Sequence, residues 1–159
     1  MRRWPGSSSD LASTMNNRRP RPWECHYNGW SWAERCAVTP LQNAMFRSGQ
    51  LTRPTVCSIC GFSDPARING SAYIFSHLER YDRPDELYAA CKRCHAALHA
   101  RFREPERWQA LLRRSAIPGS WVFALSLDPA SQWQPFDVTY PHGLPAPSLI
   151  EPNDPTFEF

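Results

Sequence analysis

The sequence predicts a small α+β domain with flanking helices and an extended, proline-rich tail. Two Cys-x-x-Cys pairs, Cys57 with Cys60 and Cys91 with Cys94, have the spacing by which one tetrahedral zinc ion takes two thiolates from each pair. The chain has 159 residues, enough for one compact domain plus tails, and its 16 prolines indicate that much of it is irregular. The domain is therefore expected to be zinc-stapled, with the structural zinc supplying folding energy.

Helical content precedes the first cysteine pair, over residues 30–48. Pro40 interrupts this segment. Because proline is tolerated in the first turn of a helix, the pattern predicts a helix over 41–48 with Thr39 as its N-cap. Gly49 is expected to end that helix, since glycine adopts the left-handed conformation that commonly follows a helix.

A short hairpin is expected between the two cysteine pairs. Turn residues at 64–65 and 69–70 precede a short aromatic strand over 73–75, and a further turn is expected at 82–86. The alanine-rich segment 92–102 predicts a helix, because alanine and leucine are strong helix formers. This helix begins directly after the first cysteine of the second pair.

Two further elements are expected after that helix. Proline at its first position favours a helix over 105–116, in which Trp108, Leu111 and Leu112 recur at helical spacing. Those three side chains are expected to be buried in the core. The alternating pattern over 121–127 is typical of a single strand.

Charge and composition divide the chain into three regions. Residues 1–22 carry five arginines and one aspartate, which predicts a flexible basic arm suited to a polyanion. Residues 23–117 hold the zinc module and its flanking helices. Residues 118–159 contain no lysine or arginine and eight of the prolines. This acidic, aromatic extension is expected to pack on the module, or to contact a protein partner.

The sequence gives no sign of a membrane protein. No apolar run approaches the ~20 residues that a membrane-spanning helix needs, and the first residues lack the apolar core of a signal peptide. In such a chain, paired cysteines are typical of metal ligands in a reducing compartment. A cytoplasmic location without a membrane partner is therefore expected.

The motifs around the cysteine pairs follow a characteristic order. Gly-x-Leu at 49–51 and Arg-Pro at 53–54 precede the first pair, and Tyr-Asp-Arg-Pro at 81–84 precedes the second. The second pair runs into His95 and His99 as Cys-x-x-Cys-His-x-x-x-His. Over about residues 30–102 this order resembles the HNH endonuclease superfamily in its zinc-containing, often phage-borne form.

The resemblance implies a ββα-metal fold with two metal sites. The four cysteines would bind structural zinc, while His77, His95 and His99 would hold a second divalent ion (Mg, Mn or Zn) against a scissile phosphate. Because His95 and His99 are four residues apart, they share one face of a helix. In this family the ion stabilises the leaving oxygen and a hairpin histidine activates water.

The predicted hairpin departs from the family pattern of two adjacent catalytic residues, commonly His-His or Asp-His. Alignment on Tyr81 makes His77 a metal ligand and puts Leu78 in the position of the general base. A shift of one residue makes His77 the base and leaves Ser76 as a poor ligand. Glu79 is the remaining candidate catalytic residue, either binding the ion or accepting a proton, and it shares a face with His77 only if the strand continues that far.

Basic residues cluster on and after the helix that carries His95 and His99. Those expected to contact a phosphate backbone are Lys92, Arg93, Arg101 and Arg103. The sequence thus predicts a zinc-binding, HNH-like protein that engages DNA or RNA and resembles a metal-dependent endonuclease. Two alternatives stay open: a degenerate member that binds nucleic acid without cleaving it, and a zinc-stapled adaptor whose extension contacts a protein.

Overall fold

A computed structural model describes residues 21, 25–63 and 74–147 of the chain. Apart from Arg21, the predicted basic arm lies outside the described residues, as do the turn signals at 64–65 and 69–70 and the end of the extension. The elements, in chain order, are α1 (Trp32–Arg47), β1 (Ile74–Leu78), β2 (Leu87–Cys91), α2 (Lys92–Ala100), α3 (Pro105–Ser115), the 3₁₀ helices η3 (Trp121–Ala124) and η4 (Pro129–Gln132), and α4 (Phe136–Thr139). The described part is therefore α+β, as predicted.

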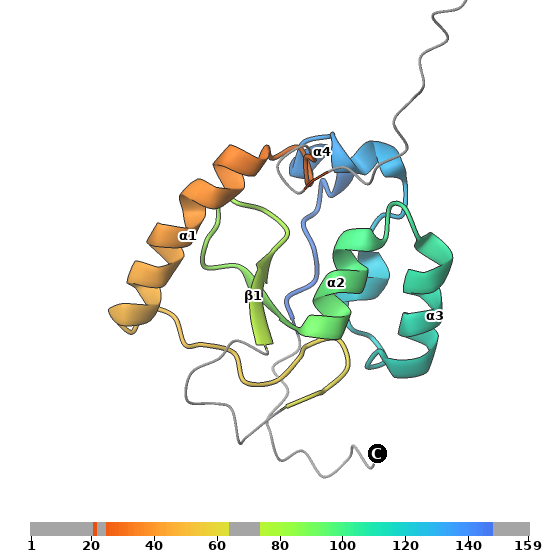
Figure 1. The fold of residues 1–159 in the computed structure, drawn as a ribbon, viewed down its shortest axis with the longest axis horizontal. Coiled ribbons are helices and arrows are strands. Elements are labelled where there is room, and N and C mark those ends of the chain that lie inside the picture. Colours follow the sequence, from red (N-terminus) through yellow and green to blue (C-terminus); the bar gives the residue numbers. More distant parts are fainter. Residues whose placement is uncertain (1–20, 22–24, 64–73, 148–159) are drawn as a thin grey trace, which may run out of the picture.

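The strands β1 and β2 form a two-stranded antiparallel hairpin in which His77 pairs with Tyr88. β1 runs on to Leu78, beyond the short strand predicted over 73–75, so His77 belongs to the hairpin. The helix α2 begins directly after β2, with Cys91 as its N-cap. In Figure 1 the hairpin and α2 lie next to each other, with α3 beyond α2 and α1 on the opposite side.

The helix α1 is continuous through Pro40, so the predicted break there and the predicted cap at Thr39 are wrong. Its N-cap is Ser31, whose hydroxyl accepts a hydrogen bond from the Glu34 backbone (3.3 Å) while the Glu34 carboxylate accepts one from the Ser31 backbone (2.7 Å). This capping box starts the helix upstream of the proline, which then removes one internal hydrogen bond. α1 buries none of its residues, and no described helix is both long and apolar enough to span a membrane.

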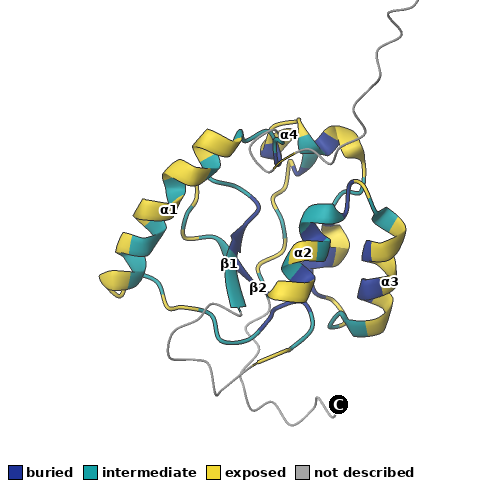
Figure 2. Ribbon diagram, in the orientation of Figure 1, coloured by how far each residue is buried: buried dark blue, intermediate teal, exposed yellow. Residues whose placement is uncertain are grey.

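The core is formed by residues of the first cysteine loop, β2, α2, α3 and the extension (Figure 2). The predicted burial of Trp108, Leu111 and Leu112 is confirmed. From the extension, the residues that join the same core are Trp121, Val122, Leu125, Phe136 and Tyr140. The described part of the extension therefore contributes side chains to this core.

The strand predicted over 121–127 is wrong, because its first residues form the 3₁₀ helix η3. The neighbours Trp121 and Val122 are both buried and the next two residues are exposed. A strand would place neighbouring side chains on opposite faces, whereas a 3₁₀ turn buries adjacent residues on one side.

Candidate metal centres

The four cysteines of the two pairs meet in one cluster. Their sulfur atoms all lie within 4.8 Å of one another, and Sγ of Cys60 is 3.9 Å from Sγ of Cys91. A tetrahedral zinc site with Zn–S bonds of about 2.3 Å separates its sulfurs by about 3.8 Å. The cysteines therefore fit a four-thiolate zinc site, as the sequence predicted.

The loop that carries the first cysteine pair is fixed by hydrogen bonds to β2 and η3. Ser58 donates to the Ala89 carbonyl oxygen from its backbone N–H (2.9 Å) and from its hydroxyl (2.8 Å), and the Trp121 indole donates to the Ser58 hydroxyl (3.0 Å). Gly61 has a φ of 72°, which turns the loop so that its N–H reaches the Cys57 carbonyl oxygen (2.9 Å). Both sulfurs of the first pair thus face the second pair.

The pKa values of the four thiols diverge because their sulfurs are so close. Contact with Cys57 lowers the pKa of Cys60 to about 7 and also lowers that of Cys91. Contact with neighbouring sulfurs raises the pKa of Cys57 and of Cys94. Adjacent thiolates repel one another, so all four ionise together only around a cation. This chemistry favours a metal site over a cluster of free thiols.

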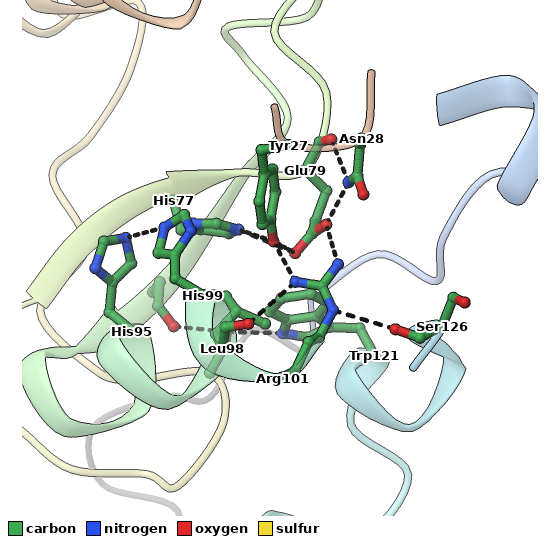
Figure 3. A network of polar contacts seen from close by, with 12 residues as sticks. Tyr27, Asn28, His77, Glu79, His95, Leu98, His99, Arg101, Trp121 and Ser126 are labelled. Carbon is green, nitrogen blue, oxygen red and sulfur yellow. Dashed lines mark hydrogen bonds and ion pairs between the residues drawn. The ribbon is translucent and has the colours of Figure 1, made fainter. Parts of the chain in front are cut away.

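Three histidines form a second cluster (Figure 3). His77 comes from β1, and His95 and His99 come from successive turns of α2. Their ligand nitrogens all lie within 4.8 Å of one another, and Nε2 of His95 is 3.2 Å from Nε2 of His99. Zn–N bonds of 2.0–2.1 Å in a tetrahedral site separate nitrogens by about 3.3 Å, so the triad fits a metal ion. Three protein ligands leave one position open, which is typical of catalytic sites.

The helical histidines are neutral at pH 7. Burial, reinforced by the nearby His77, lowers the pKa of His95 to about 4, and burial likewise lowers the pKa of His99. The Phe75 ring stacks on the His95 ring with centroids 4.5 Å apart. Neutral imidazoles in fixed orientations keep their lone pairs available to a metal.

Behind His77 lies a buried polar network centred on Glu79 (Figure 3). Oε1 of Glu79 is 2.9 Å from Nε2 of His77 and accepts from the Tyr27 hydroxyl at 2.7 Å. Oε2 accepts from Asn28 Nδ2 at 2.7 Å and from Arg101 Nη2 at 3.4 Å. Because Glu79 engages Nε2 of His77, Nδ1 is the nitrogen left for a metal ion.

The structure changes the role expected of Glu79. Its side chain is fully buried and does not line the cleft onto which the three histidines face, so it neither reaches the open side of the metal site nor accepts a proton there. Burial raises its pKa, but the Arg101 charge and the His77 and Tyr27 hydrogen bonds outweigh burial and lower the pKa to about 2. An ionised carboxylate on a ligating histidine fixes the tautomer and orientation of the ring.

The prediction that Arg101 contacts phosphate is wrong, because its side chain is fully buried. Its guanidinium donates to the Tyr27 hydroxyl at 2.6 Å and to the carbonyl oxygens of Leu98 and Ser126 at 3.2 and 3.3 Å. Arg101 is therefore the internal counter-charge of Glu79, from which it is separated by 3.4 Å.

The other residues expected to contact phosphate are exposed, but they do not form a single face. Lys92 and Arg93 lie at the start of α2, where Arg93 donates to the Ser115 hydroxyl (3.1 Å). Arg103 follows the end of α2 and lines the cleft in front of the histidines. Of the four, only Arg103 lines the cleft in front of the candidate metal site.

Tyr27 and Asn28, which sequence reasoning missed, lie on a tight turn. Tyr27 and Trp30 exchange two backbone hydrogen bonds of 3.0 Å, and positive φ values at Asn28 (48°) and Gly29 (83°) are those of a type I′ turn. A Cβ atom at Gly29 would lie 2.9 Å from the Gln134 carbonyl oxygen, so only glycine fits. An Asn-Gly pair between aromatic residues is the sequence signal that predicts such a turn.

A cleft of about 590 Å³ opens in front of the three histidines. Its walls are α1 on one side and β1 and α2 on the other. Among the described residues that line it, the charged side chains are Arg35 and Arg103, and none is aspartate or glutamate. The cleft therefore favours an anionic ligand.

The hairpin, the helix that follows it and the two clusters are together consistent with a ββα-metal-like module. Fold and site define a small α+β protein with a candidate four-thiolate zinc site and a candidate three-histidine metal site. A search of protein-family models, curated proteins and solved structures found no match to the chain. The description of this protein as a small α+β protein with two candidate metal sites therefore rests on its own fold and side-chain geometry.

Glu79→Gln is expected to weaken metal binding at the three histidines by ~10–100-fold, because a neutral amide holds His77 less firmly than a carboxylate. Isothermal titration with Co²⁺, on protein that retains its thiolate-bound zinc, measures this affinity. The matched control is Glu86→Gln, which changes a carboxylate near β2 that pairs with Arg83 at the surface (3.2 Å). Equal Co²⁺ affinity in both variants would contradict the role assigned to Glu79.

Proposed function

We propose that the chain is a metal-dependent hydrolase of phosphodiester bonds in nucleic acid. In this proposal the four cysteines hold structural zinc, and His77, His95 and His99 hold a catalytic divalent ion. The observation that carries the proposal is the convergence of three histidine nitrogens on a cleft whose charged lining residues, within the described part of the chain, are Arg35 and Arg103. A phosphodiester is the anionic substrate class that this combination suits best.

The ion at the histidines would polarise the phosphodiester and lower the pKa of a water molecule. An all-nitrogen donor set favours Zn, because Mg and Mn prefer oxygen ligands. Glu79 keeps His77 oriented, and Arg103 attracts the phosphate. Hydrolysis adds one water: its oxygen bonds to phosphorus, the bond to the leaving oxygen breaks, and that oxygen takes up a proton.

His95→Ala is expected to reduce plasmid nicking in Zn, Mn or Mg by ~100-fold or more, because two histidines do not hold the ion in place. The matched control is His142→Ala, which removes an exposed histidine outside the cleft and is expected to keep wild-type activity. Elemental analysis should find the thiolate-bound zinc in both variants. Absence of cleavage by the wild-type protein on DNA and RNA with all three ions would refute the hydrolase proposal.

Binding of nucleic acid without cleavage is the second candidate function, and Leu78 favours it. Alignment with the HNH pattern puts Leu78 in the position of the general base, and its buried, apolar side chain accepts no proton. The plasmid assay separates the two functions. Wild-type protein that binds plasmid DNA but does not nick it would establish the second.

A further inference from the structure

The cleft in front of the histidines has an aromatic wall as well as a cationic one. Trp32, at the start of α1, lines it and leaves 39% of its surface exposed. The Arg35 guanidinium carbon lies 5.1 Å from the centroid of the Trp32 ring system. Tyr81 and Phe102 also line the cleft. A planar exposed ring beside a cation is the arrangement on which unpaired bases stack in single-strand binding proteins.

The size of the cleft limits what reaches the histidines. Its volume of about 590 Å³ is in the range of sites that enclose small ligands, ~300–1,000 Å³. His77 is buried within it, and α1 forms the opposite wall. One or two unpaired nucleotides fit such a space, whereas the stacked and paired bases of a duplex do not expose a ring face to Trp32.

We propose that this cleft binds unpaired nucleotides of a single-stranded nucleic acid, with a base stacked on Trp32 and a phosphate between Arg103 and the three histidines. This proposal rests on the proposed function, because it specifies the substrate of the same site. Stacking on an aromatic ring does not depend on the identity of the base. The cleft is therefore expected to distinguish single-stranded from double-stranded nucleic acid and not one base sequence from another. The two arginines add a salt-dependent attraction for the phosphates.

Fluorescence anisotropy with labelled oligothymidine of about twelve nucleotides tests the proposal. The full chain carries its thiolate-bound zinc and no added metal, so the probe stays intact. Single-stranded probe is expected to bind at least ~10-fold more tightly than a duplex of equal length. Trp32→Ala is expected to weaken single-strand binding by ~5–150-fold, and Trp32→Phe, which keeps a planar ring, is expected to restore most of the affinity.

The matched control is Phe123→Ala, since Phe123 is 55% exposed on η3 and does not line the cleft. It is expected to bind like the wild-type protein. Trp32 belongs to a helix that buries no residue, so Trp32→Ala is expected to keep the fold, which circular dichroism and thermal unfolding verify. Equal binding of duplex and single strand, or wild-type affinity in Trp32→Ala, would overturn the proposal.

Different experimental results would refute the hydrolase proposal and the single-strand binding proposal. Metal-dependent cleavage by the wild-type protein, together with wild-type affinity of Trp32→Ala for the single-stranded probe, would remove the single-strand site and leave the hydrolase. Single-strand binding that depends on Trp32, in a protein that cleaves nothing with any of the three ions, would remove the hydrolase and leave the binding site.

Discussion

Replacement of Cys94 by serine is expected to leave the chain without a cooperatively folded core. Cys94 is fully buried and belongs to the core cluster that contains Trp108 and Trp121. Structural zinc supplies an apparent ~10–16 kcal/mol to folding at pH 7, whereas whole domains are stable by only about 5–15 kcal/mol. Loss of zinc through loss of one thiolate is therefore expected to remove a free energy comparable to the entire stability of the domain.

Circular dichroism, thermal unfolding and zinc stoichiometry measure this effect. Cys36→Ser is the matched control, because Cys36 is exposed on α1 and lies outside the thiolate cluster. It is expected to keep one zinc ion per chain and the wild-type unfolding temperature. A chelator is expected to reproduce the Cys94→Ser phenotype on the wild-type protein. Cooperative unfolding in the presence of excess chelator would show that the thiolate cluster does not stabilise the fold.

A fall in pH is expected to destabilise the folded domain, as a chelator does. Zinc-bound cysteines are thiolates, so their pKa values in the folded, metal-bound state lie below those of the unfolded chain. The zinc contribution to stability is therefore complete above the pKa of an unfolded cysteine, ~8.5, and is lost as pH falls through the folded values.

The thiolate cluster was predictable because its determinants are local. Each Cys-x-x-Cys pair fixes two sulfurs within one turn of chain, so the spacing alone indicates that two pairs share an ion. The helix α3 was predictable for a similar reason, since Trp108, Leu111 and Leu112 mark one face over a single stretch. In both cases the structure depends little on distant residues.

The polar network behind His77 was not predictable from spacing. Tyr27 lies 50 residues from His77 and 74 from Arg101, and the chain reaches them only through tertiary packing. Arg101 belongs to a basic stretch, so the sequence predicts an exposed side chain, because arginine is almost never fully buried unless it is paired. Glu79 is that partner, and only the extension of β1 to Leu78 brings it behind His77.

Arg101→Met is expected to destabilise the zinc-loaded protein by ~3–5 kcal/mol, because it leaves the buried Glu79 carboxylate without its counter-charge. Denaturant unfolding at pH 7 measures the change. The matched control is Arg103→Met two residues further on, an exposed position expected to change stability by no more than ~0.5 kcal/mol. Equal stability of the two variants would contradict the role assigned to Arg101.

The destabilisation caused by Arg101→Met is expected to depend on pH. In the wild-type protein the pKa of Glu79 is about 2, below its ordinary value of 4.5, so its contribution is complete above ~pH 4.5 and declines as pH falls toward 2. Burial is the largest influence on the pKa of Glu79 and raises it, and the Arg101 charge is the next largest and lowers it, so loss of Arg101 is expected to raise that pKa. Protonation then relieves the uncompensated charge, so the deficit of Arg101→Met is expected to shrink as pH falls from 7.

The double variant Glu79→Gln with Arg101→Met separates stability from metal binding. With both charges of the buried pair removed, it is expected to regain most of the stability that Arg101→Met loses, because a buried ion pair adds little beyond a neutral replacement. It is not expected to regain Co²⁺ affinity at the histidines, since no carboxylate holds Nε2 of His77. Recovery of both properties would mean that the ion pair serves the fold alone. Recovery of stability without affinity would mean that the buried charge is kept to orient His77.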